Sequence, residues 1–129
     1  MSTYDIGIHI RDKYAKGIIG LTFMFERFRP IEIDVSWVNC GDELEAVKNI
    51  MANLTSEKPN PCEIDEEGHF ATITPTTISD EPDKLLLHFK SDREEEFEPL
   101  TITVSKQQFH DEFQRAIQSY LALPANKNK

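Results

Sequence analysis

The sequence predicts an α+β domain with the element order βββ-α-βββ-α, in which two helices pack on one twisted antiparallel sheet or on two such sheets. Six short stretches alternate apolar and polar residues, which is the period of half-buried strands. Two longer stretches repeat apolar residues at helical spacing instead. Most connections are short, and short connections favour antiparallel pairing of consecutive strands. The pattern leaves open whether the strands form one sheet or two.

The first three predicted strands cover residues 4–11, 18–28 and 31–38. The first stretch places isoleucine at every second position, as expected for a strand with one buried face. The second and third repeat this alternation with larger apolar residues, and Pro30 separates them. These strands are therefore predicted to form an antiparallel meander.

The first helix is predicted over residues 43–54, where leucine, valine, isoleucine and methionine recur at helical spacing. Asp42 and Glu45 form a D-x-x-E variant of the capping box, which satisfies backbone N–H groups at the start of a helix. Residues 55–68 contain two prolines and a glycine, and this composition predicts a loop.

Three further strands are predicted over residues 69–75, 84–90 and 97–105. The middle stretch places leucine and phenylalanine at alternate positions, so one of its faces is expected to be buried. Pro99 has no backbone N–H, which suits the beginning of a strand or an edge position.

The last helix is the most strongly patterned element. Ser105 and Gln108 form a capping box at its start, and Pro124 ends it. Its apolar stripe at helical spacing consists of Phe109, Phe113, Ala116, Ile117, Tyr120 and Leu121. We therefore expect a single domain over residues 1–123 and a disordered tail over residues 124–129.

The acidic residues are concentrated in the middle of the chain. The formal net charge is −9, and residues 57–98 alone hold 13 acidic and four basic residues, an excess of nine. The rest of the chain holds 10 of each kind and is neutral. Phosphate backbones reward clustered lysine and arginine, so nucleic acid is not an expected partner.

Two acidic loops between predicted strands, 79–83 and 91–99, form the candidate partner-binding site, and 63–67 is a further candidate. Carboxylates clustered on turns steer a basic protein toward a surface and accept bidentate hydrogen bonds from arginine. The same charges could serve only to solvate the surface, and both interpretations stay open. In a plain meander the two loops lie at opposite ends of their shared strand. The candidate residues are Asp80, Glu81, Asp83, Asp92, Glu94, Glu95, Glu96 and Glu98.

Metal and cofactor sites are not expected. The four histidines occur singly, without the tight spacing that zinc ligands show. They are His9, His69, His88 and His110. The glycine-rich loops that bind nucleotides and the G-x-S-x-G motif of hydrolases do not occur in the sequence.

Cys40 is the best enzymatic candidate, because a helix start can lower the pKa of a thiol and create a nucleophile. Asp42 and Glu43 beside it oppose this ionisation, so a non-enzymatic protein is expected. Cys40 and Cys62 are the only cysteines, and their spacing favours reduced thiols. With no secretion signal and no apolar run of the roughly 18 to 20 residues that span a bilayer, we expect a cytoplasmic location.

The C-terminal stretch LTITVSKQQFHDEFQRAIQSYL, a strand that leads through a serine cap into an amphipathic helix, resembles the C-terminal end of bacterial immunity proteins. These proteins belong to contact-dependent inhibition and polymorphic toxin systems. The strand-then-helix layout of IEIDVSWVNCGDELEAVKNIMANL is similar to the core of the same group. The resemblance implies an antitoxin that binds one cognate toxin domain, commonly a nuclease. The alternative is an adaptor or structural subunit of a larger assembly, without a toxin partner.

Overall fold

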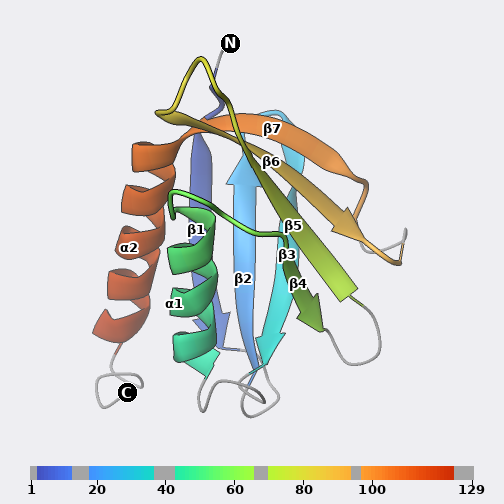
Figure 1. The fold of residues 1–129 in the computed structure, drawn as a ribbon. Coiled ribbons are helices and arrows are strands. Elements are labelled where there is room, and N and C mark those ends of the chain that lie inside the picture. The colour runs from blue at the N-terminus through green and yellow to red at the C-terminus, as the bar shows by residue number, and fades with distance from the viewer. Residues whose placement is uncertain (1–2, 13–17, 37–42, 66–69, 94–96, 124–129) are drawn as a thin grey trace.

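The computed structural model describes residues 3–12, 18–36, 43–65, 70–93 and 97–123. Seven strands and two helices lie within these ranges (Figure 1). They are β1 (Ile6–Asp12), β2 (Ile18–Phe25), β3 (Phe28–Ser36), α1 (Glu43–Leu54), β4 (Cys62–Asp65), β5 (Phe70–Thr77), β6 (Lys84–Ser91), β7 (Leu100–Ser105) and α2 (Lys106–Ala122).

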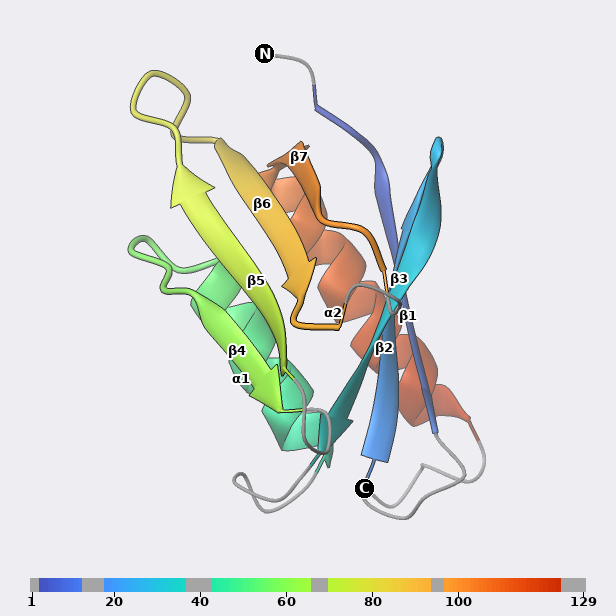
Figure 2. The same cartoon turned by 90° about the vertical axis from the view of Figure 1, so that its right-hand side faces the viewer.

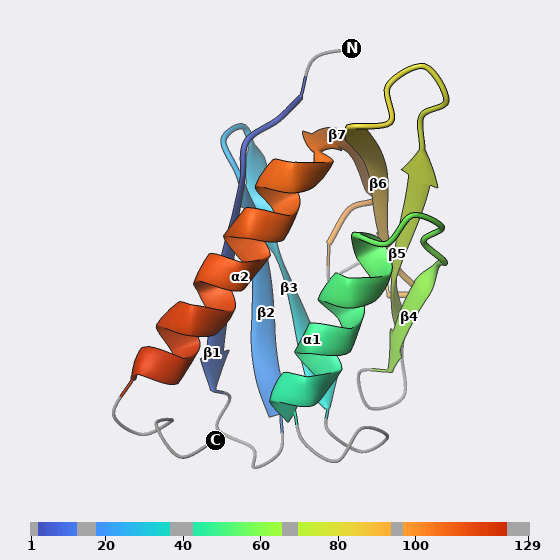
Figure 3. The same cartoon turned by 60° about the vertical axis from the view of Figure 1, so that its left-hand side comes forward.

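The strands form two antiparallel sheets. Sheet A has the order β1-β2-β3, and sheet B has the order β4-β5-β6-β7. Both helices and sheet B lie on the same side of sheet A (Figures 2 and 3). The predicted α+β class is therefore confirmed, and the strands divide into two sheets.

Two local predictions were wrong. The stretch predicted as a loop contains β4, a four-residue strand that pairs with β5. The turn between β2 and β3 lies at Glu26 and Arg27, since Phe25 pairs with Phe28, whereas the alternation had suggested a strand that continues to Phe28. Pro30 lies inside β3, which is an edge strand of sheet A and can tolerate a residue without a backbone donor.

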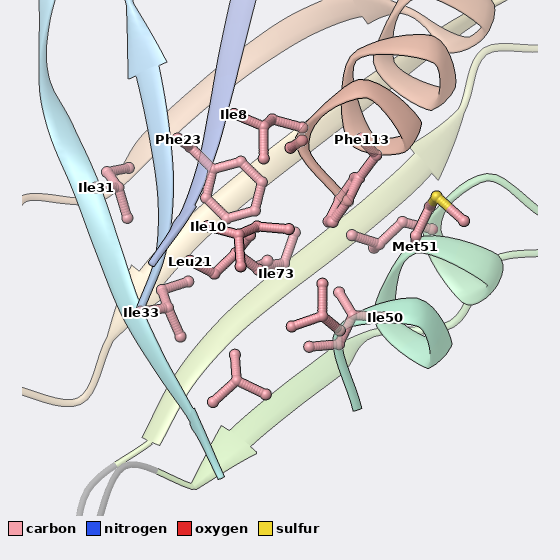
Figure 4. Packing of buried hydrophobic residues seen from close by; sticks show 14 of the residues in the cluster. Ile8, Ile10, Leu21, Phe23, Ile31, Ile33, Ile50, Met51, Ile73 and Phe113 are labelled. Carbon is pink, nitrogen blue, oxygen red and sulfur yellow. The ribbon is translucent and has the colours of Figure 1, made fainter. Parts of the chain in front are cut away.

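The hydrophobic core lies where the inner faces of both sheets meet the helices (Figure 4). The ring of Phe23 on β2 packs 5.1 Å from that of Phe89 on β6 and 6.1 Å from that of Phe113 on α2. All three side chains are fully buried. Burying a side chain of this size contributes about 1.5–3 kcal/mol. Because the three rings come from sheet A, sheet B and α2, their contact joins these parts into one core.

Helix α2 covers the free edge of β1 with side chains. The backbone N–H of Ile8 donates to Oε1 of Glu112 at 3.1 Å, and Nη2 of Arg115 donates to the carbonyl oxygen of Ile8 at 2.8 Å. Arg115 also binds Glu112, at 2.6 Å between Nη2 and Oε1. This hydrogen bond is the main cause that lowers the pKa of Glu112. The pair thus supplies the acceptor and the donor that a neighbouring strand would provide.

Two further contacts tie α2 to the strand. Ser105 caps the helix, as predicted, because its Oγ accepts from the N–H of Gln108 at 3.3 Å. The side chain of Gln108 donates to Asp5 at 3.1 Å, next to the beginning of β1. At the other end of the helix, the Tyr120 hydroxyl donates to Asp12 at 2.5 Å. Helix α2 therefore follows β1 along its length.

Candidate functional site

The acidic loops of sheet B lie at opposite ends of β6, as the predicted meander requires. Residues 78–83 join β5 to β6, and residues 92–99 join β6 to β7. The candidate residues Glu94, Glu95 and Glu96 lie outside the described residues. The two loops are therefore separate surfaces rather than one.

The loop between β5 and β6 has structural contacts of its own. Glu81 is half-buried, and its Oε1 accepts from Nζ of Lys84 at 2.7 Å. This hydrogen bond is the main cause that lowers the pKa of Glu81. The carbonyl oxygen of Asp83 accepts from the N–H of Lys106 at 2.9 Å and so supports the start of α2. Only Asp80 and Asp83 present exposed carboxylates here.

The described ends of two acidic sequence segments meet at the opposite end of sheet B. β4 ends and β5 begins at this end, because Asp65 pairs with Phe70 and the N–H of Asp92 donates to the carbonyl oxygen of Phe70 at 3.0 Å. We call residues 65–70 and 92–98 together the acidic end. These two segments contain eight acidic residues and one arginine. Within the described part of the chain, Asp92 and Glu98 are exposed there.

The acidic end also contains an exposed aromatic residue, Phe70, whose side chain remains 40% exposed. The core-facing residues of β5 are Ala71, Ile73 and Pro75, so Phe70 lies in the outward phase of the strand. Phe70 was not among the residues predicted from the sequence to bind a partner. Its position out of phase with the buried residues is the signal that could have identified it.

The histidines are spread over three elements. His9 is exposed on β1, His110 lies in the first turn of α2, and Nδ1 of His88 is 2.6 Å from Oγ1 of Thr101. Among the residues that the structure describes, no group of three histidine, cysteine, aspartate or glutamate side chains could hold a metal ion. The fourth histidine, His69, lies outside the described residues.

The one cysteine that the structure describes, Cys62, offers little reactive chemistry. Cys62 is a free thiol on β4, and burial raises its pKa, which makes a nucleophilic thiolate less accessible at neutral pH. Cys40 and its acidic neighbour Asp42 lie outside the described residues, so a nucleophilic Cys40 stays a hypothesis.

Comparison with family models, with curated proteins and with solved structures gave no match to this chain. In the described ranges, neither helix has the length and apolar composition needed to span a membrane. The placement of charge and of exposed apolar side chains is therefore the observation from which a function can be argued.

Proposed function

We propose that this chain is a cytoplasmic, non-enzymatic immunity protein that binds and neutralises a cationic, nuclease-type toxin domain. The observation that carries the proposal is the acidic end of sheet B. Its two sequence segments together contain eight acidic residues and one arginine. The exposed carboxylates of Asp92 and Glu98 form no ion pair with any basic side chain in the described part of the chain.

The partner's charge follows from its substrate. A nuclease needs a basic surface to hold phosphate, and a carboxylate-rich surface is complementary to it. Inhibition is stoichiometric: the acidic end occupies the surface that would bind nucleic acid. Long-range attraction sets the association rate, and apolar contacts at the centre of the interface set the lifetime of the complex.

The test compares matched charge removals at the two ends of sheet B. D92N/E98Q removes two charges from the acidic end, D80N/D83N removes two from the opposite loop, and E94Q/E95Q/E96Q removes three more from the acidic end. Each variant is co-expressed with the product of the adjacent upstream gene, and association with that protein is measured across salt concentrations.

We expect the acidic-end variants to slow association and to reduce its salt dependence, and D80N/D83N to do so much less. Equal association rates and salt dependences for all variants would overturn the role of the acidic end. Failure of the wild-type chain to bind any adjacent gene product would favour an adaptor whose acidity only solvates it.

A further inference from the structure

Phe70 and Phe28 are equally exposed, at 40% each, but only the exposure of Phe28 has an internal explanation. The ring of Phe28 packs 5.9 Å from that of Tyr4 and 6.4 Å from that of Phe25. Within the described residues, the ring of Phe70 has no such ring partner. Leaving a large aromatic side chain exposed on a strand forgoes the stabilisation that its burial would give.

The neighbours of Phe70 on the two adjacent strands are both acidic. Asp65 on β4 is its register partner on one side. On the other side, Asp92 continues the pairing of Ala71 with Ser91, and its N–H binds the carbonyl oxygen of Phe70. Residues opposite each other on adjacent strands have Cβ atoms about 4.5–5.5 Å apart. The outer face of sheet B therefore ends in a row that contains the exposed side chains of Phe70 and Asp92.

We propose that this row is a docking point for an arginine side chain of a protein partner, with Phe70 as its aromatic platform. The inference rests on the proposed function, because the arginine site would be one contact through which the acidic end binds a cationic partner. A guanidinium group is planar, so it can stack on an aromatic face while its N–H groups donate to a carboxylate beside the ring. The compact, strongly hydrated ammonium group of lysine matches this combination less well.

Lys90 limits the affinity of the row. It pairs with Thr72 in the adjacent row of the same face, two residues before Asp92, and its side chain is exposed. A positive charge at this position repels an incoming guanidinium group. Removing it should therefore strengthen binding, a result opposite to that of removing Asp92.

The test titrates the ¹⁵N-labelled full-length protein with acetyl-Gly-Arg-Gly-amide and follows backbone amide shifts. Matching peptides carry lysine or citrulline, the neutral isostere of arginine, in place of the arginine. We expect the arginine peptide to shift the amides of Phe70, Thr72 and Asp92, the lysine peptide to shift them less, and the citrulline peptide least.

Four variants separate the platform from general acidity. F70L keeps an apolar side chain but removes the ring, and should weaken binding of the arginine peptide about two- to fivefold. F28L removes an equally exposed ring elsewhere and should have no effect. D92N should weaken binding, and K90Q should strengthen it.

Absence of any shift at these amides, or equal affinity of F70L and wild type, would overturn the arginine site. Either result leaves the proposed function intact if D92N/E98Q still slows association with the toxin. Conversely, peptide binding that depends on Phe70 supports the arginine site even if no toxin partner is found.

Discussion

The charged residues of sheet A and α2 differ in their contacts from those at the acidic end of sheet B. In the first region, charges serve the fold: Glu112 and Arg115 bind each other and the edge of β1, and Arg11 donates to both carboxylate oxygens of Glu32 across the outer face. In the second region, the acidic end presents Asp92 and Glu98 to solvent. The sequence outside residues 57–98 is neutral, and the segment inside carries the whole net charge.

This difference separates charges that stabilise the molecule from charges that are available to a partner. Side chains that satisfy buried or edge backbone groups are costly to remove, because a polar group is left unpaired. Clustered exposed charges of one sign contribute little to stability and can even oppose it by mutual repulsion. Mutations can therefore be ranked by the region that they affect.

The largest effect is expected at the core junction that both regions share. Phe23→Ala should lower the free energy of unfolding by about 3–5 kcal/mol, since it leaves a cavity between Phe89 and Phe113. Urea denaturation followed by circular dichroism measures the loss, and F23L, expected to cost about 1 kcal/mol, serves if F23A does not fold. Thr22→Ala, on the opposite face of the same strand, is the control. Equal losses for F23A and T22A would contradict the shared core.

A smaller, pH-dependent effect is expected at the edge of β1. Because Arg115 lowers the pKa of Glu112, the contribution of this carboxylate is complete above its ordinary pKa of 4.5 and is lost as the pH falls through the lower folded value. E112Q should therefore cost about 1 kcal/mol at pH 7, and less with acidification below about pH 4.5.

Urea titrations of E112Q and wild type at several pH values measure this difference. E32Q, which disturbs an exposed pair on the face of the same sheet, should cost about 0.5 kcal/mol. A difference between E112Q and wild type that did not change with pH would show that the charge of Glu112 does not support the strand edge.

The smallest effect on stability is expected where the effect on binding is largest. D92N/E98Q should change the free energy of unfolding by less than about 0.5 kcal/mol, and any change should be a gain, because it reduces repulsion among like charges. Thermal denaturation at low and high salt checks this, since added salt should diminish any gain. A substantial loss of stability would mean that these two carboxylates stabilise the fold.

The sequence was informative about features with local signals. The alternation of isoleucines in β1 and the stripe from Phe109 to Tyr120 predicted their elements because strand and helix periods are visible within one segment. β4 was missed because it has only four residues and follows two prolines, too few for a period to appear.

The candidate site was only partly predictable for a different reason. The acidic loops stood out by composition, but the meeting of segments 65–70 and 92–98 depends on the pairing of β4, β5 and β6. The register of β5 and β6 places Asp92 beside Phe70, 22 positions earlier in the chain, and the alternation within each strand does not determine that register. The pairing of Glu112 with the backbone of Ile8 joins residues 104 positions apart, and periodicity carries no signal for it.

This separation along the chain has a consequence for biosynthesis. Glu112 and Arg115 are synthesised 104 and 107 residues after Ile8. Until then the backbone groups of Ile8 lack their native partners, and unpaired strand edges are where nascent chains aggregate. Chains truncated before α2 should therefore bind chaperones more strongly than chains that contain this helix.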